Sequence, residues 1–137
     1  MELTHIFDTS VLTRLSSDAI RAVAEPLVAA GRAARAGISD LEIGFSARDV
    51  DEWEKLANSL DELHLIETSA DHVRRARQTQ RLLAERGLKG RSIPDLLIAA
   101  AAEVEQLTVL HYDKDYDFIA EVTGQQCEWV VPRGSID

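Results

Sequence analysis

The sequence predicts an α/β protein built on a central, mainly parallel sheet of five short strands flanked by helices. β-rich apolar segments alternate along the chain with segments whose apolar residues recur at helical spacing. The chain has 137 residues, close to the usual size of one domain, and its content of 45% hydrophobic and 28% charged residues is ordinary for a globular protein. We find no repeat or linker in it. One domain is therefore predicted over residues 1–131, with a loose tail over 132–137.

The strands are predicted from short runs of apolar and β-branched residues. Asp8 comes directly after the first of these runs. Helix-breaking or turn-forming residues separate most of the runs from their neighbours. The predicted strands are 4–7, 36–38, 64–66, 108–112 and 127–131.

The helices are predicted from apolar periodicity and from capping residues. Ser39 and Ser69 stand where helix N-caps are expected, Pro94 suits a first helical turn, and Gly124 suits a helix end. An alanine-rich segment is predicted as one helix that Pro26 kinks or splits. The predicted helices are 11–15, 18–35, 39–46, 50–60, 69–86, 94–105 and 115–123.

The charge is unevenly distributed along the chain. The net charge is −9, which excludes a protein that coats nucleic acid with its whole surface. Residues 71–91 nevertheless carry a local balance of +5, which leaves −14 for the rest of the chain. This segment is either a phosphate-binding surface or a solvated helix face with pairs such as Asp71–Arg75 and Arg81–Glu85. The candidates for contacting substrate phosphate are Arg74, Arg77, Arg81 and Arg91.

Several other classes of protein are disfavoured. The first residues lack the basic and apolar stretches of a secretory signal, and the longest apolar run has seven residues, so a soluble, cytoplasmic protein without a membrane partner is predicted. The four histidines show no zinc-site spacing, and no glycine-rich phosphate loop occurs. Cys127 lies in an apolar stretch and is interpreted as a small core residue.

Four acidic residues occupy positions where ligands bind in α/β folds. Asp8 and Asp113 follow predicted strands, while Glu42 and Asp95 stand in first turns of predicted helices. Each also has a purely structural explanation. Asp8 and Asp95 suit helix starts, Asp113 suits a turn, and Glu42 completes a capping box with Ser39.

The joint pattern resembles the PIN-domain family over nearly the full length of the chain. The segment 6–10 (IFDTS) resembles the first acidic motif of that family, and 38–44 (ISDLEIG) resembles its glutamate-bearing helix start. The segment 93–102 (IPDLLIAAAA) resembles the third motif closely, and 109–118 (VLHYDKDYDF) resembles the fourth. The chain departs from the family at His111, where threonine is frequent, and has Tyr116 as the aromatic residue after the second aspartate.

This resemblance, and in particular the likeness to VapC-type toxins of VapBC toxin-antitoxin pairs, implies an endoribonuclease that binds Mg²⁺, with Mn²⁺ as a substitute. It implies catalytic and metal-binding roles for Asp8, Glu42, Asp95 and Asp113. Asp115 is a further candidate ligand or supporting residue, and Ser10 is expected to give a supporting polar contact.

The resemblance also implies partners. It predicts a homodimer, a transfer or ribosomal RNA substrate, and inhibition by a VapB-like antitoxin whose tail enters the acidic groove. Two alternatives remain at this point. One is a PIN nuclease that acts in RNA processing or on DNA, and the other is a non-enzymatic, receiver-like signalling module with an acidic Mg²⁺ pocket.

Overall fold

A computed structural model describes residues 2–88 and 92–137 of the chain, so the predicted phosphate contact Arg91 lies outside the described residues. The predicted sheet of five strands is confirmed, and its strand order is β3-β2-β1-β4-β5. Every neighbouring pair in this sheet runs parallel. The strands are β1 (His5–Phe7), β2 (Ala33–Ala36), β3 (His64–Ile66), β4 (Thr108–His111) and β5 (Cys127–Trp129).

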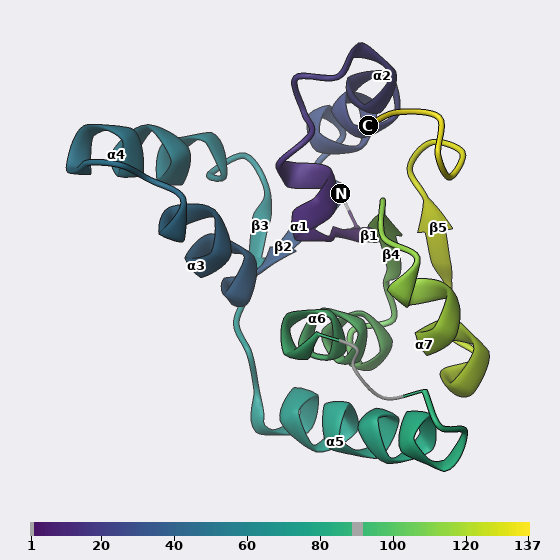
Figure 1. Cartoon of the computed structure of the whole chain (residues 1–137). Helices are drawn as coiled ribbons and strands as arrows, with labels where there is room; N and C mark the ends of the chain where they lie inside the picture. Colours follow the sequence, from purple (N-terminus) through teal and green to yellow (C-terminus); the bar gives the residue numbers. More distant parts are fainter. Residues whose placement is uncertain (1, 89–91) are drawn as a thin grey trace.

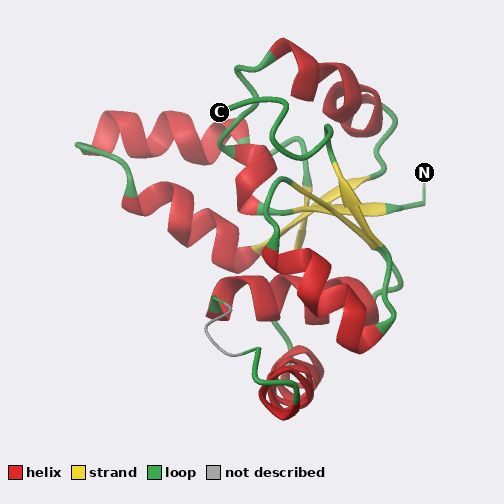
Figure 2. Cartoon of the chain, turned by 45° about the vertical axis from the view of Figure 1, so that its right-hand side comes forward, coloured by secondary structure: helices red, strands yellow, loops and turns green. Residues whose placement is uncertain are grey.

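Helices cover both faces of the sheet (Figures 1 and 2). One apolar cluster joins strands β1, β2 and β4 to α5, α6 and α7, and a second joins the opposite face to α1 and α2. The pair α3 and α4 projects from the side of the sheet (Figure 1). The helices are α1 (Thr9–Leu12), α2 (Asp18–Ala29), α3 (Gly37–Phe45), α4 (Val50–Ser59), α5 (Ala70–Glu85), α6 (Ile93–Val104) and α7 (Asp115–Thr123).

The strand order places a switch point between β1 and β4. From β1 the chain continues to β2 and β3 on one side of the sheet, whereas β4 and β5 lie on the other side. In open parallel sheets the crevice beyond the carboxyl ends of the strands at such a point is the usual place for a ligand. Asp8 follows β1 directly and Asp113 follows β4 after one residue, so both lie at this crevice.

The prediction of one helix over 18–35 and a strand over 36–38 is wrong. Helix α2 passes through Pro26 and ends at Ala29, and Gly31 then takes a left-handed conformation (φ 70°) that a helix cannot continue. The next residues form β2 between β1 and β3. Alanine favours helices on its own, but here burial within the sheet outweighs that preference.

The predicted N-cap at Ser39 is also wrong. Helix α3 begins at Gly37 with Ala36 as its N-cap, so Ser39 lies inside the first turn. The side chain of Ser39 is fully buried and forms a hydrogen bond of 2.8 Å with the Thr9 hydroxyl. The capping-box explanation of Glu42 therefore does not apply.

The tail over 132–137 is held against the domain rather than loose. The Tyr112 hydroxyl donates to the carbonyl oxygen of Ile136 at 2.5 Å, and Arg14 forms an ion pair with Asp137 at 2.5 Å. Ile136 also packs against the second apolar cluster. Among the described residues, no helix is both long and apolar enough to cross a membrane.

Candidate metal centre

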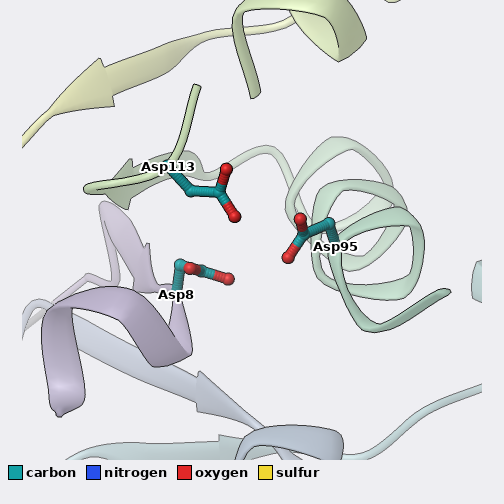
Figure 3. Close-up of side chains that lie close together, drawn as sticks. All are labelled: Asp8, Asp95 and Asp113. Carbon is teal, nitrogen blue, oxygen red and sulfur yellow. The ribbon is translucent and has the colours of Figure 1, made fainter. Parts of the chain in front are cut away.

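Three carboxyl groups converge at the switch point. Asp8, Asp95 and Asp113 each offer one oxygen, and these oxygens all lie within 4.8 Å of one another. Figure 3 shows the three side chains pointing toward a common centre, from the end of β1, the start of α6 and the loop after β4. Three negative charges this close repel one another strongly in a partly buried site, so the arrangement favours a bound cation.

Asp8 is held by one hydrogen-bond donor on each carboxylate oxygen. It is the N-cap of α1, and its Oδ2 accepts from the backbone N–H of Ser10 at 2.9 Å. Its Oδ1 accepts from the Tyr116 hydroxyl at 2.5 Å. With only 2% of its surface exposed, Asp8 is oriented by these contacts and not by solvent.

Asp95 has a strongly raised pKa. It lies in the first turn of α6, where its backbone N–H donates to the N-cap Ser92, and its side chain is buried, with no hydrogen-bond partner for Oδ2 among residues 2–88 and 92–137. Burial is the largest cause that raises its pKa to about 8, and the charges of Asp8 and Asp113 contribute to the same rise. A divalent cation would supply the missing partner and return Asp95 to its ionised form.

Asp113 is placed by the backbone around it. Its N–H donates to His111 Nδ1 at 3.2 Å, and its Oδ1 accepts from the backbone N–H of Asp115 at 2.9 Å, where α7 begins. His111 is fully buried between the rings of Tyr116 and Trp129, with centroids 4.8 and 4.9 Å away. Burial lowers the pKa of His111, so its neutral imidazole serves as a hydrogen-bond acceptor.

The other predicted site residues lie around this cluster. Glu42 is exposed, and its Oε1 accepts from the hydroxyl of Thr9 at 2.7 Å, next to Asp8 in the chain. Ser10 Oγ accepts from the backbone N–H of Tyr112 at 2.9 Å and so ties α1 to the end of β4. Asp115 contacts the cluster through its backbone N–H, which donates to Asp113 Oδ1. Neither Thr9 nor the Tyr116 hydroxyl was identified as a site contact from sequence, because both contacts depend on how distant segments pack.

The predicted arginines lie on the exposed side of α5. Arg74, Arg77 and Arg81 line a shallow groove on that helix. Arg74 is paired with Asp71, and Arg81 is paired with Glu85 as expected. The expected Asp71–Arg75 pair does not form.

Arg75 instead crosses from α5 to α6. Its guanidinium donates to both carboxylate oxygens of Glu103, at 2.7 and 2.9 Å. This hydrogen bonding raises the pKa of Arg75 above its ordinary value. Arg75 therefore contributes to helix packing, whereas the outer arginines remain accessible to a polyanion.

The cluster offers oxygen ligands only. Among residues 2–88 and 92–137, no histidine or cysteine joins the three carboxylates, and such a donor set suits hard cations such as Mg²⁺, Mn²⁺ or Ca²⁺ rather than zinc. The fold and this cluster together define a class of protein, an α/β domain with three carboxylates that could hold a cation at the switch point of its sheet.

The family model of the PIN domain matches residues 6–122. The chain therefore belongs to the PIN-domain family, and the expected resemblance is confirmed. It is 56% identical to ribonuclease VapC51 of Mycobacterium tuberculosis over 137 residues, which cover 100% of both chains. It is 47% identical to ribonuclease VapC18 of the same organism, over 83% of this chain and 88% of that protein.

Solved structures support the same fold. VapBC2 from Rickettsia felis, bound to a DNA fragment from its promoter, matches with a TM-score of 0.78 and 21% identity, over 94% of this chain and 99% of that chain. VapBC-1 from nontypeable Haemophilus influenzae matches with a TM-score of 0.77 and 15% identity, over 95% and 98%. The receiver-like alternative does not fit these relatives.

Proposed function

We propose that this chain is a metal-dependent endoribonuclease, the toxin of a VapBC-type toxin-antitoxin pair. The observation that carries the proposal is the convergence of Asp8, Asp95 and Asp113, with a buried oxygen of Asp95 that has no partner in the described part of the chain. A buried carboxylate oxygen without a partner raises the free energy of the folded domain unless a ligand binds it. The similarity to ribonucleases of the VapC type supports hydrolysis of RNA as the reaction.

We take the cation to be Mg²⁺, with Mn²⁺ as a substitute. Mg²⁺ binds through one or two carboxylates and retains several waters, and three close carboxylates offer more than enough ligands for one such ion. When bound, the ion would supply an activated water and would neutralise charge on the phosphate oxygens.

The surrounding residues have separate tasks in this proposal. Asp8 and Asp95 bind the cation from positions fixed by packing, and Asp113 binds it from the turn after β4. Glu42 is a fourth ligand, or an acceptor for a metal-bound water, at the exposed rim beside Thr9. Ser10 supports the end of β4 by accepting from the backbone N–H of Tyr112, and Asp115 supports the turn after β4 by donating to Asp113.

The arginine groove on α5 is the proposed contact for the RNA backbone. Arg77 is exposed, and the ion pairs of Arg74 and Arg81 in the described part of the chain are with surface acids on their own helix, which solvent weakens. A phosphate can therefore replace those partners at little cost. Such contacts raise affinity for RNA without selecting its sequence.

The antitoxin is the proposed partner for the α3–α4 pair. Large apolar side chains are exposed there, including Leu41 (71%), Phe45 (92%) and Trp53 (51%). Apolar groups gathered in this way mark a protein-binding surface. We expect a VapB-like chain to cover them and to place an arginine or lysine near the carboxylates, where it would compete with the cation.

A homodimer is the remaining part of the proposal. An apolar hollow lies between α5 and α6 and is lined in part by Val73, Ile93 and Leu97. Val73 is 45% exposed and Ile93 is 65% exposed. A second copy of this chain would bury these groups. Sedimentation of wild type and Val73→Asp tests this, because a dimer at this surface requires the variant to be monomeric.

The activity is tested with purified, antitoxin-free protein and total cellular RNA. Mg²⁺-dependent discrete products that are absent with EDTA and with Asp95→Asn are expected, and mapping of their ends names the substrate. Asp51→Asn, an exposed acid in the first turn of α4, is the matched control and should cleave normally. Cleavage of a DNA substrate in place of RNA would favour the alternative of a PIN nuclease that acts on DNA. Full activity of Asp95→Asn would overturn the role of Asp95 in metal binding.

A further inference from the structure

We infer that the Tyr116 hydroxyl is a positioning group that orients the cation-binding carboxylates. It donates to Asp8 Oδ1 at 2.5 Å and lies 3.4 Å from Asp95 Oδ1, so it bridges an acid that follows β1 and an acid in the first turn of α6. Tyr116 itself belongs to the first turn of α7. One side chain thus connects three elements around the centre. The inference rests on the proposed metal site.

The hydroxyl is not needed to fill space. Tyr116 is fully buried, and its ring packs against His111 with centroids 4.8 Å apart and an interplanar angle of 33°. A phenylalanine ring would keep this packing. The polar atom at the end of the ring therefore serves its hydrogen-bond partners, because burying a hydroxyl costs free energy that only a partner offsets.

The geometry at Asp8 shows what the donor does. Ser10 N–H occupies one lone pair of Oδ2 at 2.9 Å, and Tyr116 occupies one lone pair of Oδ1. Each carboxylate oxygen has two lone pairs, so one on each oxygen stays available for a cation. With both oxygens held by hydrogen bonds, the Asp8 carboxylate cannot rotate about the Cβ–Cγ bond. The carboxylate is thus oriented before the ion arrives, which is how groups around a metal site increase affinity.

The contact with Asp95 adds a second effect. Among the described residues, the Tyr116 hydroxyl is the only side-chain donor placed between Asp8 and Asp95. When both acids are ionised, as cation binding requires, a neutral O–H between them reduces their repulsion without competing as a cation would. Loss of this donor should therefore leave the acids free to turn apart, and a bound ion would have to bring them together again.

The test compares Tyr116→Phe with Tyr112→Phe. Tyr112→Phe makes the same chemical change at a hydroxyl that binds the backbone of Ile136 in the tail, away from the carboxylates. Mn²⁺ affinity is measured by calorimetry for wild type and both variants, with unfolding in EDTA as the measure of folding. We expect the Mn²⁺ dissociation constant to rise about ten-fold in Tyr116→Phe and to stay unchanged in Tyr112→Phe.

A second readout separates positioning from a general loss of stability. The Mn²⁺ concentration for half-maximal RNA cleavage should rise in Tyr116→Phe, while the rate at saturating Mn²⁺ stays near that of wild type. Unchanged or tighter Mn²⁺ binding by folded Tyr116→Phe, with normal binding by wild type, would overturn this inference alone. Absence of Mn²⁺ binding by wild type would overturn the proposed metal site and this inference together.

Discussion

Asp8 and Asp95 come from different elements, and each brings a ligand oxygen within 4.8 Å of the other. Asp8 has a donor on both of its oxygens, whereas Asp95 Oδ2 is buried and has no partner among the residues that the structure describes. This asymmetry identifies Asp95 as the acid whose charge depends most on a cation. It also makes the metal-free domain sensitive to pH.

The first prediction concerns this pH dependence. The pKa of Asp95 is raised from 3.8 to about 8 in the folded protein, mainly by burial, while in the unfolded chain it keeps its ordinary value. Between pH 3.8 and about 8, Asp95 holds a proton in the folded state that it has lost in the unfolded state. The contribution of Asp95 to the free energy of unfolding is therefore full below pH 3.8 and is lost as the pH rises to about 8, by up to ~1.4 kcal/mol per pH unit.

Urea unfolding in EDTA between pH 5 and 8.5 measures this effect. Asp95→Asn should remove this part of the slope, because asparagine does not titrate, and should be more stable than wild type near pH 8. Saturating Mn²⁺ should reverse the trend for wild type, since the ion binds the ionised carboxylate. Equal pH slopes for wild type and Asp95→Asn would show that Asp95 keeps an ordinary pKa.

The second prediction concerns Arg35, which holds the α3–α4 pair to the sheet. Its side chain is only 11% exposed, and it donates to Asp40 at 2.8 Å and to the carbonyl oxygen of Leu60 at 2.7 Å. Arg35→Ala removes the guanidinium partner of the Asp40 carboxylate and leaves the Leu60 carbonyl oxygen with only the backbone N–H of Leu63 among the described residues, so it should lower the free energy of unfolding by about 3 kcal/mol.

The control is Arg48→Ala, which removes a surface pair between Arg48, just before α4, and Glu52 in the first turn of that helix. It should cost less than about 0.5 kcal/mol. Denaturant midpoints at one pH give both values. If the two variants lose similar stability, the network around Arg35 is not a main attachment of α3 and α4.

The sequence predicts most helices because their signals are local. Ser69 caps α5, Pro94 stands in the first turn of α6, and Gly124 ends α7 in a left-handed conformation. The sheet is less accessible to such reasoning. Strand β2 is built from alanines and one arginine, and its neighbours in the sheet determine its conformation.

In the candidate site, too, the residues with local sequence signals can be predicted, and the contacts that depend on tertiary packing cannot. Asp8, Asp95 and Asp113 can be predicted because each stands at a strand end or helix start that the pattern identifies. The bond from Tyr116 to Asp8 cannot be predicted, because it depends on how α7 packs against β1. For the same reason the sequence does not place Glu42, which the structure positions beside Thr9 at the exposed rim.

The third prediction concerns RNA binding on α5. Arg77→Ala and Arg81→Ala should each raise the Michaelis constant for RNA a few-fold and leave the rate at saturating RNA unchanged. Each lost phosphate contact should also reduce the salt dependence of binding by about one in the log–log slope. Cleavage and filter-binding assays over a salt series measure both effects. Arg48→Ala is the control, and an identical response from it would point to a general charge effect.

The fourth prediction concerns Ser10, whose hydroxyl accepts from the backbone N–H of Tyr112 at 2.9 Å. Ser10→Ala leaves this partly buried N–H without an acceptor, so the free energy of unfolding should fall by about 1–2 kcal/mol. Tyr112 precedes Asp113, and a looser turn there should also weaken Mn²⁺ binding a few-fold. Ser59→Ala removes a hydroxyl that bonds only within α4 and should change neither quantity. Unchanged Mn²⁺ affinity in Ser10→Ala, measured by calorimetry alongside the stability loss, would restrict Ser10 to a role in folding.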